Sequence, residues 1–307
     1  MKESRDRTAV LIAGPTASGK SAVALKVARE LDGIIINADA MQLYAELRVL
    51  TSRPTEGDER SAPHRLYGSV PARELWSVGR WLATAKSEME AAWAEGKVPV
   101  VTGGTGLYFK ALEEGLSHVP PIPQAVRDHW RERLQAEGAP ALHGELARLA
   151  PEDAARLEPG DSQRIVRNLE VLEATGKPLS LHFAAAKEAS VLKGVNVRRV
   201  AILPPRDELY AVIDARFETM LAMGAVNEVK ALLALKLQED VPVMKAIGVK
   251  PLSDMLAGVL SPEQAVALAQ RQSRNYAKRQ MTWIRNQMAD WPVVEKRTQA
   301  IEVLLNG

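Results

Sequence analysis

The chain has 307 residues, of which 46% are hydrophobic and 25% charged, a composition typical of a globular protein. Its 40 basic and 38 acidic residues leave a formal net charge of +2, so affinity for nucleic acid has to come from a local cluster of charge. The absence of cysteine excludes disulfides, thiolate catalysis and cysteine-ligated zinc. No apolar stretch approaches the roughly 20 residues of a membrane span, and the first apolar run is too short for a signal peptide. We therefore expect a cytoplasmic protein with no membrane partner.

The N-terminal part of the chain predicts a strand, a glycine-rich loop and a helix in direct succession. Residues 8–13 form a short apolar run rich in β-branched side chains, which is typical of a buried strand. From residue 20 to residue 31 the apolar side chains recur at helical spacing. The intervening residues 14–21 read Gly-Pro-Thr-Ala-Ser-Gly-Lys-Ser and satisfy the full G-x-x-x-x-G-K-[ST] pattern of a P-loop between strand and helix.

This loop predicts a phosphate site for physical reasons. Its glycines let backbone N–H groups approach phosphate oxygens, and the helix N-terminus adds favourable partial charge. Lys20 can reach the oxygens as a point charge, and the Ser21 hydroxyl can ligate Mg²⁺. The predicted phosphate-binding residues are Gly14, Pro15, Thr16, Ala17, Ser18, Gly19, Lys20 and Ser21. The loop alone leaves open whether the phosphate belongs to a nucleoside triphosphate or to another diphosphate.

Two further buried strands are predicted, at residues 33–37 and 98–102. The first delivers Asp39 just beyond its carboxyl end, and the second ends in a Gly-Gly-Thr-Gly turn at residues 103–106. Strands that alternate with helices imply a parallel sheet, whose ligands bind at the carboxyl ends of the strands. The predicted fold class is therefore α/β, with a P-loop NTPase-like parallel sheet core.

The segment between these strands divides into two parts. Residues 49–70 show little periodicity and several turn residues, so we predict a loop region. Ser77 is a suitable N-cap for a helix with one apolar face, and Gly96 is a suitable stop for it.

Beyond the third strand the composition becomes rich in alanine, arginine and leucine, with helical periodicity. Asp161 is a candidate N-cap for one helix there, which ends at residues 175–178. Strand-like character returns at residues 198–203, and a long final helix is predicted near residues 261–289. The predicted organisation is a catalytic core formed by residues 1–116 and 196–307, with a helical insertion domain at residues 117–195.

A kinase or a nucleotide-hydrolysing enzyme would need a carboxylate of the Walker-B kind at the end of another apolar strand. The strand at 98–102 ends without an acid, whereas the strand at 33–37 supplies Asp39. An aspartate at that position can also be an ordinary turn residue, so position alone leaves its role open.

Six motifs in order together resemble the bacterial tRNA dimethylallyltransferases, also called tRNA isopentenyltransferases. They span about residues 8–290 and are Gly-Pro-Thr-Ala-Ser-Gly-Lys-Ser (14–21), Asn-Ala-Asp-Ala-Met-Gln-Leu-Tyr (37–44), Gly-Gly-Thr-Gly-Leu-Tyr (103–108), Gln-Arg-Ile-Val-Arg (163–167), Lys-Ala-Ile-Gly (245–248) and Tyr-Ala-Lys-Arg-Gln-Met-Thr-Trp (276–283). The chain departs from the commoner family pattern at Ala40, at residues 45–54 and at Val249, which concerns loop details and substrate contacts.

The resemblance implies transfer of a dimethylallyl group from dimethylallyl diphosphate to the exocyclic amine of the adenosine immediately 3′ of the tRNA anticodon. It implies that the P-loop holds diphosphate with Mg²⁺ as cofactor, and that Asp39 is the general base. Lys20 and Arg216 would stabilise the leaving diphosphate, and Thr105 would reach the adenine or the diphosphate. Without the resemblance, Arg216 is equally an exposed helix charge, and Thr105 an ordinary turn residue.

The RNA-binding prediction rests on two helical segments. No acidic residue occurs between residues 264 and 289, where Arg271, Arg274, Lys278 and Arg285 follow roughly helical spacing. Such a face can be merely solvated, and Tyr276 and Trp283 can either stack on bases or pack in the core. With the resemblance, the predicted tRNA-binding residues are Asp39, Ala40, Met41, Gln42, Thr105, Arg127, Gln163, Arg164, Ile165, Val166, Arg167, Lys245, Arg274, Lys278 and Arg279. The five histidines show no metal-ligand spacing, and for His64 we expect a structural role.

We expect the predicted tRNA prenyltransferase to be monomeric. Three other functions would make different demands on the chain. A P-loop kinase would need to bind a nucleoside triphosphate. An enzyme that prenylates free adenine nucleotides would need neither the insertion nor the basic helix. A non-catalytic RNA-binding module would leave the P-loop and Asp39 without a role.

Overall fold

The computed structural model describes residues 7–184, 189–238 and 241–306. The chain forms two compact units, each of which is considered by itself. The first comprises the chain up to Glu113 and from Val191 onward, and the second is Glu114–Ser190. Among the described residues, none of the helices combines the length and apolar character that a membrane span requires.

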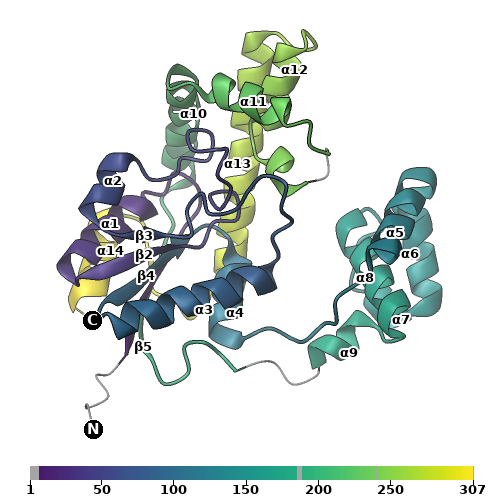
Figure 1. The fold of residues 1–307 in the computed structure, drawn as a ribbon, viewed down its shortest axis with the longest axis horizontal. Coiled ribbons are helices and arrows are strands. Elements are labelled where there is room, and N and C mark those ends of the chain that lie inside the picture. The colour runs from purple at the N-terminus through teal and green to yellow at the C-terminus, as the bar shows by residue number, and fades with distance from the viewer. Residues whose placement is uncertain (1–6, 185–188, 239–240, 307) are drawn as a thin grey trace. The chain divides into compact units, whose positions relative to one another are not determined.

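The first unit contains a parallel sheet and the helices that cover it (Figure 1). Its strands are β1 (Thr8–Ala13), β2 (Gly33–Asn37), β3 (His64–Arg65), β4 (Val98–Gly103), β5 (Asn196–Ile202) and β6 (Val293–Val294). Its helices are α1 (Lys20–Glu30), α2 (Glu56–Ser61), α3 (Val78–Ala94), α4 (Gly106–Glu114), α10 (Arg206–Ala222), α11 (Ala225–Ala234), the 3₁₀ helix η1 (Pro242–Lys245), α12 (Val249–Leu256), α13 (Pro262–Gln287) and α14 (Arg297–Asn306).

The six strands lie in the order β3-β2-β4-β1-β5-β6, and every neighbouring pair is parallel. This confirms the predicted α/β fold with a parallel sheet. Strand β1 lies inside the sheet, with β4 on one side and β5 on the other. The carboxyl ends of all strands share one edge, which is where α/β proteins bind ligands. The P-loop, Asp39 and the Gly103–Gly106 turn therefore emerge side by side.

Two layers of helices cover the sheet. On one face, α1 and α14 pack against alternating strand residues such as Val10, Ile12 and Val100, with Leu304 fully buried among them. On the opposite face lie α3 and α4, where the Trp81 and Tyr108 rings stack with centroids 4.0 Å apart. Burial on both faces explains why the central strands read as continuous apolar runs.

Two predicted segments need correction. The region 49–70, predicted as a loop, contains α2 and β3. Helix α2 buries none of its residues and is stabilised by a capping box between Thr55 and Asp58, so it has no hydrophobic periodicity to detect. The long helix predicted near 261–289 exists as α13, but it is not the final one. Strand β6 and helix α14 follow it, and β6 has only two residues and depends on pairing with β5.

The second unit consists of helices, as the periodicity predicts: α5 (Gln124–Glu137), α6 (Ala139–Leu149), α7 (Pro151–Ala154), α8 (Ser162–Thr175) and α9 (Leu179–Ala184). Its core brings together Trp130, Leu142, Leu146, Ile165 and Leu169. The predicted N-caps are confirmed in both units, since Asp161 accepts a hydrogen bond from Arg164 N and Ser77 accepts one from Arg80 N.

Candidate active site

The P-loop connects β1 to α1 with two residues in the left-handed conformation, Ala17 (φ 64°) and Gly19 (φ 84°). At Gly14 a side chain has no room, because a Cβ there would lie 2.5 Å from Ser18 Oγ and 3.0 Å from the Ile202 carbonyl oxygen. Lys20 begins α1, and its ammonium group donates to the Pro15 carbonyl oxygen at 3.1 Å. The loop thus curls around the lysine, the arrangement that presents a cation and backbone amides to a phosphate.

A cavity of about 830 Å³ opens in front of this loop. It is lined by residues 16–21 of the loop, by Asp39 and Gln42 beyond β2, by Arg53 and Tyr67, and by Arg216 of α10. The structure therefore brings Asp39, Lys20 and Arg216 to one cavity, although Arg216 lies 177 positions beyond Asp39 and 196 beyond Lys20 in the chain. Arg216 is not an isolated surface charge.

Asp39 is positioned by a set of hydrogen bonds around Asn37, the last residue of β2. The Asn37 amide accepts from Asp39 N at 2.8 Å and donates to the carbonyl oxygens of Asp39 and Leu66. The Trp81 indole donates to the Asn37 carbonyl oxygen at 2.9 Å. One Asp39 carboxylate oxygen accepts from Met41 N at 3.0 Å, which holds the carboxylate at the cavity wall and leaves its second oxygen available.

Thr105 lies in contact with the Asp39 segment. Its backbone N–H donates to the Ala38 carbonyl oxygen at 3.1 Å, and its hydroxyl accepts from Ala40 N at 3.0 Å. Close approach of the two loops requires glycine at position 103, where a Cβ would lie 2.1 Å from the Ala38 carbonyl. The turn after β4 therefore fixes the backbone on both sides of Asp39. The two predicted site residues Asp39 and Thr105 belong to one hydrogen-bonded network.

Charges at the cavity act on one another. Burial lowers the pKa of Lys20 to about 8, Asp39 opposes that shift and Arg216 adds to it. Burial also lowers the pKa of Arg216, again opposed by Asp39. The two cations thus lie in a poorly solvated place where their positive charges repel each other and a single carboxylate offsets them. Such an arrangement favours an anionic ligand.

Gln280 of α13 was missed as a site residue, although it lies within the motif at 276–283. Its side-chain oxygen accepts from Thr16 N at 2.9 Å, and its side-chain nitrogen donates to the Gly104 carbonyl oxygen at 2.9 Å. Gln280 is 5% exposed. It ties the P-loop to the turn after β4 from a helix that lies 264 positions away in the chain, and no local pattern signals such a contact.

Replacing Gln280 by methionine, which keeps length but not the hydrogen bonds, is expected to lower the free energy of unfolding by about 1–3 kcal/mol, since two partly buried backbone groups each lose a hydrogen bond worth about 0.5–1.5 kcal/mol. The Michaelis constant for the phosphate substrate should rise as the loop loosens. Chemical denaturation and steady-state kinetics measure the two effects. The matched control is Gln270→Met on the same helix, where a single bond to the Asp214 carbonyl oxygen is lost. Equal behaviour of both variants would contradict the assignment.

Glu228 of α11 is a second residue that sequence reasoning missed. Its carboxylate accepts hydrogen bonds from the backbone N–H groups of Arg48, Val49 and Leu50 at 2.7–2.9 Å. It thereby holds the loop 45–54, one of the segments where the sequence departs from the family pattern. Gln42 ties the same loop down by donating to the carbonyl oxygens of Thr51 and Ser52. The predicted tRNA residue Gln42 is thus engaged in loop structure.

Ala40 and Val249 also depart from the common family pattern. The Ala40 backbone N–H donates to the Thr105 hydroxyl, and Val249 is 1% exposed at the start of α12. Val249 therefore packs in the interior instead of contacting a substrate. His64 lies at the cavity wall with Nδ1 2.9 Å from the Ala62 carbonyl oxygen, and burial lowers its pKa.

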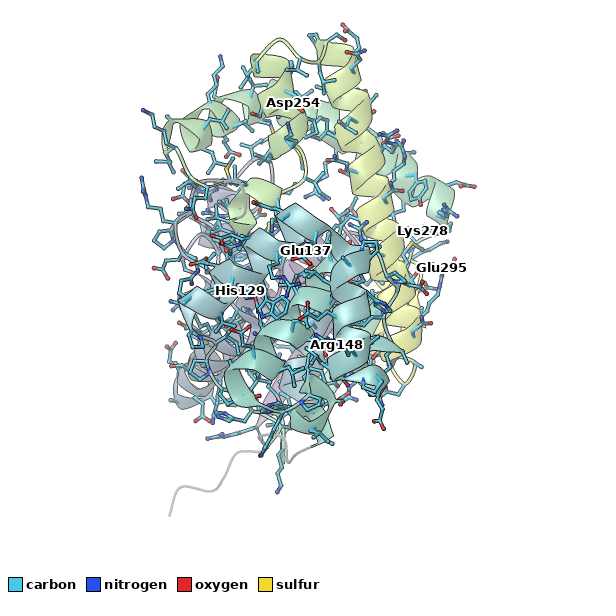
Figure 2. The ribbon with its side chains drawn as sticks, turned by 90° about the vertical axis from the view of Figure 1, so that its right-hand side faces the viewer. His129, Glu137, Arg148, Asp254, Lys278 and Glu295 are labelled. Atoms are coloured by element: carbon cyan, nitrogen blue, oxygen red, sulfur yellow. The ribbon has the colours of Figure 1, made fainter. Side chains whose placement is uncertain are left out.

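Helix α13 carries the predicted basic face. Arg271, Lys278, Arg279 and Arg285 are exposed, and Lys278 lies on the outer side of the helix (Figure 2). Arg274 differs, since it forms a salt bridge with Asp214 of α10 at 2.6 Å. Its charge is already neutralised within the protein, which leaves it less suited to phosphate than its neighbours.

The two aromatic side chains of α13 point inward. Trp283 packs on the turn after β4, where a Cβ on Gly106 would lie 2.0 Å from the indole nitrogen. Burial raises the pKa of Tyr276, and the negative charge of Asp39 adds to this shift. The Thr105 and Gln280 side chains are within hydrogen-bonding reach of the Tyr276 hydroxyl and act in the opposite direction. Of the two predicted uses, the structure assigns packing to Trp283 and places Tyr276 at the rim of the Asp39 site. Lys245, by contrast, is exposed at the end of η1.

The remaining predicted tRNA residues lie in the second unit. Gln163 and Arg164 are exposed on α8, and Arg167 pairs with Glu170 at 3.5 Å on the same helix. Ile165 is fully buried in the helical core and Val166 packs against that core, so any contact of position 165 with tRNA would have to use its backbone. Helical periodicity turns every third or fourth residue inward. Arg127 is half-buried on α5.

The fold and the site define a class: an α/β P-loop protein whose cavity combines a phosphate-binding loop, a carboxylate and two buried cations. Two family models match the sequence, "IPP transferase" over residues 42–287 and "Isopentenyl transferase" over residues 7–75. The chain belongs to the IPP transferase family and is an enzyme of the tRNA dimethylallyltransferase type.

Known relatives cover almost the whole chain. A tRNA dimethylallyltransferase of Sinorhizobium medicae is 49% identical over 301 residues, covering 98% of this chain and 97% of the relative. One from Agrobacterium fabrum is 51% identical, covering 92% and 94%.

Solved structures agree with the fold. The tRNA isopentenylpyrophosphate transferase of Bacillus halodurans is similar with a TM-score of 0.68 and 29% identity, covering 97% of this chain and 94% of that one. A eukaryotic dimethylallyltransferase acting on tRNA has a TM-score of 0.81 at 23% identity and covers 98% of this chain and 77% of that one.

Proposed function

We propose that this enzyme transfers a dimethylallyl group from dimethylallyl diphosphate to the N6 amine of the adenosine 3′-adjacent to the anticodon in tRNA. The observation that carries this proposal is the shared cavity of the P-loop, Asp39 and Arg216. The reaction type, transfer of a dimethylallyl group to tRNA, is inferred from the names of the relatives. A diphosphate that fills the P-loop places its allylic carbon toward the Asp39 end of the same cavity.

In the proposed step, the N6 nitrogen forms a bond to C1 of the dimethylallyl group as the bond from C1 to the diphosphate oxygen breaks. The electron pair of that bond leaves with the diphosphate, and the proton on nitrogen passes to Asp39. Lys20, Arg216 and the P-loop amides stabilise the negative charge that develops on the leaving group. Because the acceptor base is normally stacked, it has to be extruded from the anticodon loop to reach the cavity.

Mg²⁺ fits the side chains that line this cavity. In proteins it keeps several waters and binds one or two protein oxygens together with substrate phosphates. The Ser21 hydroxyl and the Asp39 carboxylate lie at the same cavity, while the described residues contain no cluster of three His, Cys, Asp or Glu side chains. Ser21 would therefore hold the ion jointly with the diphosphate. When bound, the ion would neutralise charge on the leaving group.

For tRNA we propose two candidate surfaces, each considered by itself: the exposed basic residues of α13 with Lys245 in the first unit, and the exposed face of α8 in the second. Phosphate contacts position an RNA, whereas single-stranded loops are read by their bases. We further propose that the enzyme acts as a monomer in the cytoplasm, where its tRNA substrate occurs.

The deciding experiment supplies purified protein with dimethylallyl diphosphate, Mg²⁺ and an anticodon stem-loop that bears the adenosine. Mass spectrometry of the digested RNA should detect isopentenyladenosine. When guanosine replaces the acceptor adenosine, no prenylated nucleoside should be detected. Calorimetry with ATP in place of the donor tests the kinase alternative. Tight ATP binding combined with no prenyl transfer would overturn the proposal.

The protonation of Lys20 makes donor affinity depend on pH. With its pKa near 8, Lys20 is charged below pH 8 in the free enzyme and loses its proton above it. A bound diphosphate stabilises the charged form and raises that pKa, so affinity should be level below pH 8. Above pH 8 it should fall about tenfold per unit. Titration calorimetry between pH 6.5 and 9.5 measures the profile. Lys20→Arg, which stays charged, should show no such fall, and identical profiles would contradict the assignment.

A further inference from the structure

The C-terminal segment reaches the P-loop by a route that the sheet dictates. Strand β6 pairs in parallel with the carboxyl end of β5, with Val293 opposite Ala201 and Val294 opposite Ile202. The Leu203 N–H donates to the Val294 carbonyl oxygen at 2.8 Å. Because parallel strands end at the same edge, the chain leaves β6 beside the P-loop. Residues 295–298 consequently line the same cavity as Lys20 and Arg216.

Arg297 lies directly on the P-loop. A Cβ at Gly19 would come within 2.6 Å of Arg297 Cδ and 3.4 Å of its Nε. Gly19 has φ 84° and is the N-cap of α1, so the left-handed turn favours glycine, and the Arg297 side chain lies over it. The guanidinium group is therefore held at the N-terminus of α1, where a phosphate would bind.

Arg297 is an exposed cation placed among other positive groups. Arg297 is the first residue of α14, and cations are disfavoured at a helix N-terminus. It also lies at the N-terminus of α1 and shares the cavity wall with Lys20, Arg53, Arg216 and Lys296. It forms no hydrogen bond or ion pair with any residue that the structure describes, and Glu208 and Glu295 of the same cavity wall do not neutralise it.

A second group in the cavity also lacks a partner. Ser18 is 5% exposed, and its hydroxyl makes no hydrogen bond with any described residue. It belongs to the part of the P-loop that lines the cavity. The Ser18 oxygen is itself inaccessible and faces Gly14, so of these two groups only the Arg297 guanidinium, at the start of α14, can reach an anion in the cavity.

We propose that Arg297 is a further diphosphate-binding residue, which closes the outer side of the P-loop over the leaving group. This rests on the proposed function of the P-loop. The planar guanidinium offers a bidentate contact to phosphate oxygens that Lys20, a point charge, cannot. Lys20 of α1, Arg216 of α10 and Arg297 at the start of α14 would then surround the diphosphate.

The test measures binding of inorganic diphosphate, in the presence of Mg²⁺, to the full-length enzyme by titration calorimetry. Arg297→Ala should weaken binding about 10- to 100-fold, the effect of losing charge-assisted hydrogen bonds, and Arg297→Lys should lie between it and the parent. Arg29→Ala, at the other end of α1 and exposed, is the matched control and should bind like the parent. Affinity for the tRNA stem-loop should be unchanged in all three variants.

Lys20→Met separates this inference from the function on which it rests. If Lys20→Met loses diphosphate binding while Arg297→Ala and Arg29→Ala both bind like the parent, the inference about Arg297 is wrong and the P-loop assignment stands. If the parent protein does not bind diphosphate, or if Lys20→Met binds it equally well, the proposed function of the loop fails first. Thermal unfolding of each variant verifies that the exposed substitutions leave the fold intact.

Discussion

Replacing Asp39 by asparagine is expected to lower turnover by about 10²- to 10⁴-fold, the range typical of a removed general base, with little change in affinity for tRNA. The substitution keeps the shape of the side chain. Its amide oxygen can still accept the Met41 N–H, as the carboxylate does at 3.0 Å. What is lost is the carboxylate that, in the proposed mechanism, takes the proton from the attacking amine. The position of the loop beyond β2 is retained, because Asn37 holds it by separate bonds.

Single-turnover kinetics under saturating donor and a binding assay with the anticodon stem-loop measure the two quantities separately. Glu208→Gln is the matched control, since Glu208 lines the same cavity but is exposed at the start of α10. It should retain near-parental turnover. An Asp39→Asn variant that bound tRNA poorly yet turned over normally would assign Asp39 to RNA binding and remove it from the chemistry.

The second large effect is expected at Lys20. Lys20→Met should lower kcat/KM for the donor by about 10²- to 10³-fold, as for a group that stabilises the charge of the transition state. The methionine side chain still fills the space inside the P-loop, but the bond to the Pro15 carbonyl oxygen and the cation are both removed. Since burial already disfavours the charged lysine, the folded protein should lose no stability on the substitution.

Steady-state kinetics with varied dimethylallyl diphosphate, together with urea unfolding, test this expectation. Lys26→Met lies on the same helix and removes only an exposed ion pair with Glu30, so it should leave both measurements unchanged. A Lys20→Met variant with parental kcat/KM would show that backbone amides alone hold the diphosphate. A large loss of stability without a kinetic effect would make the lysine a structural residue.

Both expectations rest on features that can be read in the sequence. The P-loop pattern is local, because a strand, eight loop residues and a helix are enough to define it, and its setting was predicted correctly. The apolar runs of β1, β2 and β4 could be recognised for the same reason, since strands buried on two faces need continuous hydrophobic residues. Even the N-caps Ser77 and Asp161 were predictable, because capping acts over three residues.

Errors occurred where an element depends on a distant partner. Strands β3 and β6 have two residues each, too few to carry a periodic signal, and they exist because β2 and β5 offer them an edge. Helix α2 has no buried residue. The motif at residues 163–167 likewise does not reveal that the Ile165 side chain is turned into the core of the second unit.

By itself the sequence determined the position of the P-loop between β1 and α1, the carboxylate that follows β2 and the family to which the chain belongs. These follow from short patterns whose physical causes lie within a few residues. Only the tertiary structure decided which side chains complete the site. Gln280 bonds to Thr16, Glu228 to residues 48–50 and Arg297 packs on Gly19, each across more than 170 positions of sequence. Such contacts arise from the parallel sheet and from the helices around it, which bring distant segments to one edge, and no local rule specifies them.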